Sequence, residues 1–375
     1  MKRGFTFTSI LVVLLGPGSP VRAQDYTVGS YAMWNAQRAI GPRVLENPGI
    51  VGILLTRPWN EVEIAEEQYD WSRIDARIAE ASASGLKVAL SISASPLNAP
   101  GWIQSAPGAI TIPWLDTGTC TVRRVPVFWD PGFHGAKRRL IRAMGRRYSS
   151  NPIVVGVMAA FANFRTNDWY VPHAVVSSGP CGVQLDQVQE FRDAGYTTSR
   201  MLRIGREIIG DTARAFPDQI IKLPIGTTHR RLDESASYLA ESILSYAYGN
   251  RKFGHRVCVQ LNSLNTLRPT ASELAGLQLG PNSFHYIYRL LQRRPLAGLQ
   301  MVDAAALGGI NGCQQNGGNV PCDPVAVLDH SVDLGVSYRP LFLEFWTDDS
   351  TDRVLAPVLQ RATSELQAAG GGAGN

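Results

Sequence analysis

Three acidic residues stand at or just beyond the ends of apolar segments that predict strands: Glu344, Asp168 and Asp303. Glu344 lies in the apolar and aromatic run 341–346, and in a strand its side chain would share one face with the ring of Trp346. Two carboxyl groups on either side of a bond can act as general acid and as base or nucleophile, which is the chemistry of glycosidic-bond cleavage. These acids are therefore the candidates for catalysis, and the tryptophan is a candidate platform for a sugar ring.

Each acid also has a structural interpretation. Glu344 could form an ion pair with an arginine of another strand, such as Arg57. Asp168 could cap a helix or lie in a surface loop, and Asp303 could cap the segment that follows it. Asp116, in a long loop rich in Pro, Gly and Thr, is a further candidate acid.

The segment 49–102 indicates the elements that would position such residues. Residues 50–55 predict a buried strand, residues 71–81 a helix with apolar side chains three or four apart, and residues 87–93 a second buried strand. This is a βαβ unit, which implies a parallel sheet with functional loops after its strands.

The same alternation continues along the chain. Eight strand patterns, most of them followed by a helical pattern such as 133–148 or 186–216, predict a single (β/α)8 barrel over residues 24–368 and a flexible tail at 369–375. An open doubly wound sheet is the alternative, but no glycine-rich phosphate-binding turn is present. The predicted strands lie at 26–34, 50–55, 87–93, 153–160, 219–225, 256–261, 296–302 and 340–345.

The first 23 residues predict a secretory signal peptide. Lys2 and Arg3 precede a short apolar stretch, and the segment ends in Val-Arg-Ala with a cleavage point after Ala23. A transmembrane anchor fits less well, because the apolar stretch is short and contains Gly-Pro-Gly. We therefore expect a secreted or periplasmic protein without a stable membrane anchor.

Charge gives no indication of a polyanionic partner. The formal net charge of +5 falls to +2 when the three basic residues of the signal segment are removed. The arginine pairs elsewhere are scattered, as on solvated surfaces, so we expect no nucleic-acid partner. Nothing in the sequence defines the oligomeric state.

Cysteine positions predict two disulfides in the exported protein. Cys313 and Cys322 bracket a short Gly/Asn/Gln-rich loop, and Cys120 and Cys181 both fall in long loops. Cys258 lies in an apolar run and is interpreted as a buried free thiol. No zinc-binding spacing or other metal motif is present, and we expect neither a metal nor a cofactor.

One pattern resembles a known group of proteins. It reads W-x3-E, then Y-D-W-S-x-I-D-x-R-I, then G-L-K-V-x-L-S-I, with Pro-Gly-Trp shortly after it. It resembles the second and third βα units of the clan of retaining (β/α)8 glycoside hydrolases, which includes β-galactosidase-like and cellulase-like families. The likeness covers residues 49–157, and its carriers are Trp59, Glu63, Tyr69, Asp70, Trp71, Asp75, Gly85, Leu86 and Trp102.

The resemblance implies catalytic glutamates at two strand ends, and this chain departs from both. The clan has Asn-Glu after strand four, with the Glu as acid/base, and a nucleophilic Glu after strand seven. Here strand four runs into Asn163 and Asp168 with no Glu, and strand seven ends at Gln300 and Asp303. Glu344 comes one strand later.

Further residues are predicted to bind substrate. The resemblance implies that Arg57 braces the nucleophile and that Glu63 is structural. Polar residues at the ends of strands four, five and six could bond sugar hydroxyls or loop backbone, and tryptophans in the loops after strands could stack on sugar rings. These residues are Asn163, His229, Asn262, Trp59, Trp102, Trp114, Trp169 and Trp346.

We therefore predict a secreted glycoside hydrolase that cleaves an extracellular poly- or oligosaccharide, with Glu344 and either Asp168 or Asp303 as the catalytic pair. A carbohydrate-binding barrel that has lost its catalytic acids is the alternative, because the Asn-Glu pair is missing. A barrel enzyme of another chemistry, such as a lyase or transglycosylase, is a third interpretation.

Overall fold

The structure is a computed structural model that describes residues 26–116, 119–161, 163, 181–182, 185–228, 231–283, 285–294, 296–307, 313 and 320–370. Within them, eight parallel strands close into a barrel in the order β1, β2, β5, β8, β9, β10, β11 and β12, and β12 pairs with β1. The predicted (β/α)8 barrel is confirmed. The strands span Gly29–Asn35, Ile50–Pro58, Lys87–Ser93, Val154–Met158, Ile220–Pro224, Val257–Leu264, Ala297–Met301 and Phe342–Phe345.

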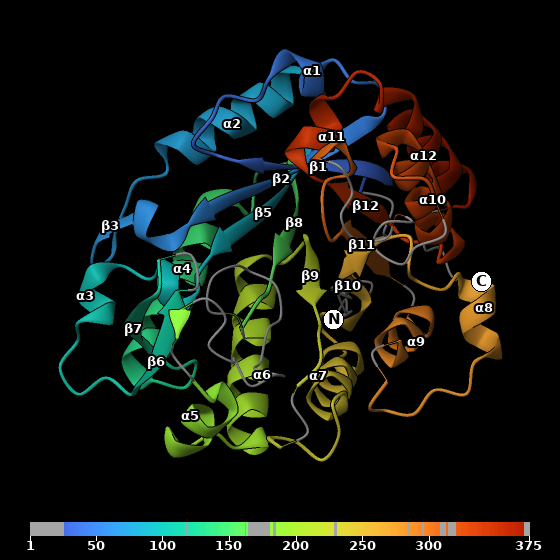
Figure 1. Cartoon of the computed structure of the whole chain (residues 1–375). Coiled ribbons are helices and arrows are strands. Elements are labelled where there is room, and N and C mark those ends of the chain that lie inside the picture. Colours follow the sequence, from blue (N-terminus) through green and yellow to red (C-terminus); the bar gives the residue numbers. More distant parts are fainter. Residues whose placement is uncertain are drawn as a thin grey trace, which may run out of the picture.

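Helices lie outside the ring of strands and cover it (Figure 1). Local signals define their ends: the Asp130 side chain accepts a hydrogen bond from the Phe133 N–H at 2.8 Å and caps α4. Gly85 follows α2 with a φ of 73°, the left-handed conformation that favours glycine. The main helices are α2 (Ser72–Ala83), α4 (Pro131–Tyr148), α6 (Thr198–Ala215), α7 (Tyr238–Gly249), α9 (Tyr286–Gln292), α10 (Pro324–Ser337) and α12 (Ala356–Ala368).

Three predicted segments differ from the structure. Residues 186–216 form two helices, because Gly195 turns the chain at a φ of 84° and Thr197 caps a new helix. The last helix, predicted over residues 351–368, begins later, at Ala356, and the short helix α11 precedes it. The predicted loop 94–127 contains a helix and a hairpin. The elements concerned are α3 (Gly101–Gln104), β6 (Thr111–Asp116), β7 (Thr121–Pro126), α5 (Gln187–Asp193) and α11 (Thr347–Thr351).

Alternate side chains of the strands fill the barrel in layers. Near the amino ends of the strands, the rings of Tyr31 and Phe342 pack with centroids 6.0 Å apart. Gly52 and Gly298 make room for them, because a Cβ at these positions would lie 2.2 Å from Tyr31 and 2.0 Å from Phe342. The next layer toward the carboxyl ends is apolar beside β1, β2, β5 and β8, and consists of Met33, Leu54, Ala89 and Met158.

Both predicted disulfides, Cys120–Cys181 and Cys313–Cys322, are present, and Cys258 is a buried free thiol as predicted. No helix among the described residues is long and apolar enough to cross a membrane.

Candidate functional site

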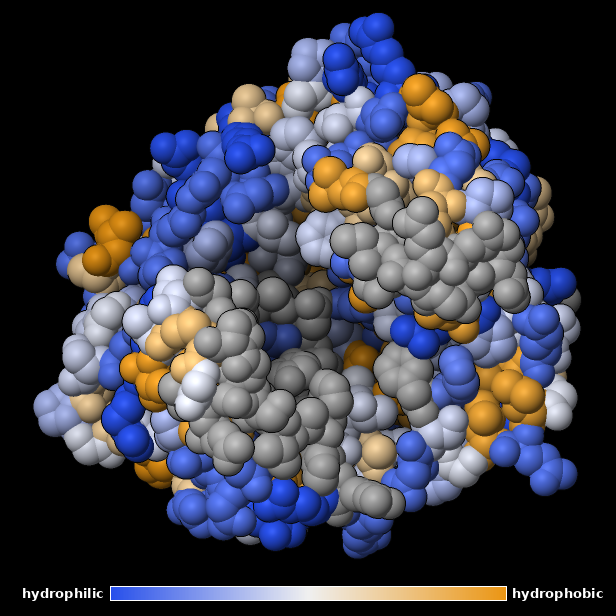
Figure 2. All heavy atoms as spheres, viewed as in Figure 1, coloured by the Kyte–Doolittle hydropathy of each residue, from blue (hydrophilic) through white to orange (hydrophobic). Residues whose placement is uncertain are grey.

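A cavity of about 360 Å³ opens at the carboxyl ends of the strands, the end that we call the barrel mouth. The centre of this face is hollowed in the space-filling view (Figure 2). Met33, Leu54 and Met158, from the apolar layer described above, form its floor. In (β/α)8 enzymes ligands bind at this end of the barrel, so the mouth cavity is the candidate site.

The walls of the mouth cavity carry mostly neutral polar groups. Two of them are joined, because the Asn98 amide donates to the Ser93 hydroxyl at 2.9 Å. Among the lining residues that the structure describes, none is an Asp or a Glu, and Arg57 is the one charged residue. The neutral polar residues of the lining are Asn35, Thr56, Ser91, Ser93, Asn98, Gln300 and Thr347.

Arg57 is only 8% exposed and lies near the end of β2. Its Nη2 pairs with Glu61 Oε2 at 3.1 Å, whereas its Nη1 is buried without a hydrogen-bond partner. Burial lowers the pKa of the guanidinium and the neighbouring Glu61 carboxylate opposes that shift, but an arginine stays charged in proteins. The Arg57 side chain shares a face of the sheet with Leu55 and with Ile92, its register neighbour on β5, so the guanidinium lies on the helix side of β2.

Trp346 stands directly after β12 and is 38% exposed. Its indole N–H donates to the Met301 carbonyl at 3.0 Å, which fixes the ring beside the mouth cavity. Trp346 thus lies at the mouth, where the sequence analysis placed it, and its role in binding a sugar stays a prediction.

Glu344 does not line the mouth, so its predicted location is wrong. It is fully buried inside the barrel, forms an ion pair with Lys222 of β9, and accepts a hydrogen bond from the Gln260 amide of β10 at 2.8 Å. The Lys222 Nζ also lies 4.0 Å from the centroid of the Phe342 ring. Glu344 shares the inner face with Trp346 but stands two residues deeper. Its structural interpretation holds, with a lysine in place of the predicted Arg57.

The other predicted acids and amides are spread around the barrel. Asp303 follows β11 and is partly exposed, and Asn163 is partly exposed shortly after β8. The Asn262 side-chain oxygen accepts from the Gln260 amide at 2.7 Å, which connects it to the buried ion pair. Asp168, Trp169 and His229 lie outside the described residues.

Two predicted stacking tryptophans belong to the protein core instead. Trp59 is fully buried, donates to Glu63 Oε2 at 2.6 Å and contacts Phe133 edge-on. Trp102 is partly buried on α3, lies 6.0 Å from the Arg139 guanidinium carbon and does not line the cavity. Both were assigned to exposed loops because their short helical turns, η2 (Trp59–Glu61) and α3, were not recognised in the sequence.

Comparisons with known proteins find similar structures but no match in sequence. No family model and no curated protein matches the sequence. The catalytic domain of a β-amylase from Paenibacillus polymyxa is similar in structure, with a TM-score of 0.53 and 10% identity over 92% of this chain and 99% of that one. A β-galactosidase from Rahnella sp. R3 gives a TM-score of 0.54 and 12% identity over 94% of this chain and 58% of that one. A β-galactosidase from Marinomonas ef1 gives a TM-score of 0.53 and 13% identity over 90% of this chain and 59% of that one.

This chain has a (β/α)8 fold similar to that of the β-amylase domain and the two β-galactosidases. The resemblance noted in the sequence is thereby confirmed as a likeness of fold. The chain spans less than two thirds of either β-galactosidase.

The sequence analysis missed several cavity residues. Ser91 and Ser93 alternate with Ile92 near the end of β5, so both serines face the barrel while the isoleucine faces the helices. Hydroxyl groups at alternate positions of an apolar strand were the signal that could have identified them. Lys222 carried a similar signal, because a single lysine in an apolar strand requires an anionic partner.

Metal ligands do not gather in the described ranges: no group of three or more His, Cys, Asp or Glu side chains is placed to hold an ion there. The arrangement instead offers hydroxyl, amide and indole groups around one concave cavity, which suits a polar organic ligand.

Proposed function

We propose that this protein is exported and binds an extracellular poly- or oligosaccharide in the mouth cavity. The observation that carries the proposal is the exposed ring of Trp346 beside a wall of neutral hydroxyl and amide groups. A sugar ring has an apolar face that stacks on indole and an edge of hydroxyls that exchanges hydrogen bonds with such groups.

Two further observations support this proposal. The similar structures named above are a β-amylase and β-galactosidases, names that denote carbohydrate-active enzymes. Disulfides such as Cys120–Cys181 persist in oxidising compartments outside the cytosol, which agrees with the signal peptide predicted for residues 1–23.

Cleavage of glycosidic bonds is the second candidate function. It needs two carboxyl groups about 5–10 Å apart across the bond, and Glu344 is engaged inside the barrel. Asp303 favours this candidate, because it is partly exposed just after β11, and Asp168 would be the second acid. One would protonate the leaving oxygen while the other attacks the sugar or activates water. Binding is the better supported function, because no described lining residue of the cavity is a carboxylate.

The test of binding measures affinity by calorimetry on a panel of plant and bacterial oligosaccharides. Trp346→Ala is expected to weaken binding at least tenfold, which corresponds to about 1.4 kcal/mol. Trp346→Phe, the matched control, keeps an aromatic face and should retain most of the affinity. Absence of binding to every member of the panel by the wild-type protein would contradict the proposal.

The test of cleavage measures released reducing ends on the same panel for the wild type, Asp303→Asn and Asp168→Asn. Turnover that either substitution abolishes would identify a hydrolase. Binding without any released reducing ends would identify a carbohydrate-binding barrel.

A further inference from the structure

The bottom of the mouth cavity is formed by three apolar side chains, which we call the apolar floor. Met33, Leu54 and Met158 line the cavity and pack with Ala89 in one cluster inside the barrel. The strand registers place them side by side, because Met33 pairs with Leu54 and Leu54 pairs with Ala89. These side chains offer at most the weak acceptor of a thioether sulfur, so a hydroxyl group placed on them lacks a full hydrogen-bond partner.

Polar side chains begin one step above the apolar floor, and we call them the polar layer. On each of β1, β2 and β5 the cavity residue two positions further along the strand is polar. These residues are register neighbours, since Asn35 pairs with Thr56 and Thr56 pairs with Ser91. Two residues of a strand span about 6–7 Å. A sugar ring whose hydroxyls meet the polar layer therefore holds any substituent that points along the barrel axis over the apolar floor.

The side of the cavity across the barrel from β5 is polar at depth. Gln300 of β11 lines the cavity there, is 7% exposed and pairs in register with Glu344, two residues before Trp346. The charged residue of the described lining, Arg57, turns its side chain to the helix side of β2. The described lining therefore presents a neutral surface, apolar at depth beside β1, β2, β5 and β8 and carrying an amide beside β11.

We infer that the mouth cavity selects a 6-deoxyhexose unit, a sugar whose C6 is a methyl group instead of a hydroxymethyl group, and seats that methyl group on Met33, Leu54 and Met158. This inference rests on the proposed carbohydrate-binding function. The ring stacks on Trp346, and its hydroxyls meet the polar layer and the Gln300 amide. The methyl group is stabilised by leaving water, whereas the C6 hydroxyl of an ordinary hexose would lose its hydrogen bonds to water at the apolar floor.

Two other classes of sugar suit this cavity less well. A uronic acid would bring a carboxylate to the apolar floor, where no cationic side chain of the described lining faces it. An N-acetylated sugar carries its methyl group beyond an amide, whose N–H and C=O both need partners close to the apolar floor. The 6-deoxyhexose places a methyl group there without any additional polar atom.

Calorimetry on matched pairs of sugars tests the inference. Two pairs differ only in the C6 hydroxyl: L-rhamnose with L-mannose, and L-fucose with L-galactose. The 6-deoxy sugar of at least one pair is expected to bind the wild type about tenfold or more tightly than its parent, because the parent buries an unpaired hydroxyl. A third pair, N-acetyl-D-glucosamine with D-glucose, measures the effect of a methyl group that an amide carries.

Variants assign the preference to the apolar floor. Met158 is partly buried, and Met158→Gln supplies an amide that can bond the C6 hydroxyl, so the affinity ratio within a pair should fall close to one. Met158→Leu, the matched control, keeps the floor apolar and should leave the ratio within about twofold of the wild-type value. Thr56→Val, in the polar layer, should weaken the binding of both sugars of a pair alike, because both present the same ring hydroxyls to that layer.

An affinity ratio near one in both 6-deoxy pairs overturns the inference, and so does a preference confined to the N-acetylated sugar. Binding of a fully hydroxylated oligosaccharide without binding of rhamnose or fucose overturns it too. A ratio that Met158→Gln leaves unchanged removes the assignment to the apolar floor, and the wild-type ratio stays decisive if that variant does not fold. In these cases carbohydrate binding itself would stand. Absence of binding to all sugars would remove the proposed function as well.

Discussion

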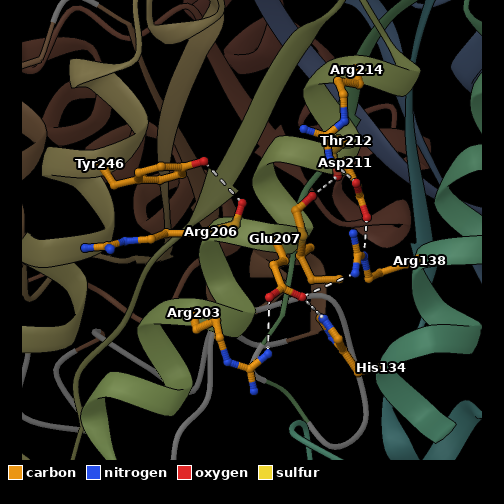
Figure 3. Close-up of polar contacts among 10 residues, drawn as sticks. His134, Arg138, Arg203, Arg206, Glu207, Asp211, Thr212, Arg214 and Tyr246 are labelled. Atoms are coloured by element: carbon orange, nitrogen blue, oxygen red, sulfur yellow. Dashed lines mark hydrogen bonds and ion pairs between the residues drawn. The ribbon is translucent and has the colours of Figure 1, made fainter. Parts of the chain in front are cut away.

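Charged side chains meet inside the barrel and also between helices α4 and α6, and the two places differ in their access to water. Lys222 and Glu344 form their ion pair with no exposed surface on either residue. Between the helices, Glu207 is 30% exposed and contacts His134 at 2.8 Å, Arg203 at 3.1 Å and Arg138 at 3.4 Å (Figure 3).

The ion pairs between α4 and α6 form a network, which we call the helix network. It tolerates substitution because each of its carboxylates has more than one partner. Asp211 pairs with both Arg138 and Arg214, so neither carboxylate of the network depends on a single cation. Burial raises the pKa of Glu207, but hydrogen bonds from His134 and Arg203 outweigh it and hold that pKa below its usual value. Water reaches the Glu207 carboxylate and can replace one partner that is removed from it.

The barrel pair has no such substitute. Among the described contacts of Glu344 are the Lys222 ammonium and the Gln260 amide, and both groups come from the barrel interior. Removing one charge leaves the other in a medium that cannot solvate it. A pair of this kind therefore makes the interior intolerant of single substitutions.

The largest expected effect comes from breaking the barrel pair. Glu344→Gln leaves the Lys222 ammonium buried without an anion, so we expect the free energy of unfolding to fall by about 3–5 kcal/mol. Urea denaturation measures the change. The double variant Lys222→Met with Glu344→Leu removes both charges and should recover most of the loss. Equal destabilisation by the single and double variants would contradict this account of the pair.

Lys137 is a second buried charge to compare with the water-accessible helix network. It lies on α4 next to Arg138, but its side chain faces the barrel. It is 7% exposed, and burial lowers its pKa from 10.5 to about 7. Between these pH values the unfolded chain binds a proton that the folded protein does not, so stability falls as the pH drops from 10.5 to 7 and is constant below.

Lys137→Met should therefore raise the free energy of unfolding at pH 7 by about 2–4 kcal/mol, from 1.36 kcal/mol per pKa unit reduced by local relaxation. It should also flatten the pH dependence of stability between the two pKa values. Thermal unfolding measured across this range tests both. Arg138→Met, one residue along the helix, is the control, and it should leave the pH dependence of stability unchanged. A loss of stability at pH 7 in Lys137→Met would refute the burial argument.

The smallest effect is expected in the helix network. Glu207→Gln removes a shared carboxylate that water already reaches, so we expect the free energy of unfolding to change by about 0–1 kcal/mol. The change should shrink further at high salt. Urea denaturation at two salt concentrations measures it, and a loss as large as that of Glu344→Gln would erase the distinction between the two regions.

Much of the fold was predictable because its signals are local. Strands such as Val154–Met158 are short apolar runs between breakers, and all eight barrel strands were predicted within a few residues. Helix ends depended on single residues, and the missed break at Gly195 shows how one left-handed glycine divides a helical pattern.

The site was less predictable. Trp346 was placed at the mouth as predicted, whereas Trp59 was assigned to the surface and lies in the core. The serines of β5 and Gln300 of β11 were overlooked, although they line the cavity. Their strands lie far apart in the sequence, and only closure of the barrel brings them to one cavity.

The sequence by itself determined that Glu344 and Trp346 share one face of their strand, because side chains of a strand alternate with a period of two. Only the tertiary structure decided how deep each one lies, since depth depends on the stagger of neighbouring strands in the closed barrel. Trp346 follows Glu344 by two residues, yet its ring lies at the cavity whereas the Glu344 carboxylate pairs with Lys222. Alternation within one strand defines a face, whereas the position along the barrel axis is defined by all eight strands together.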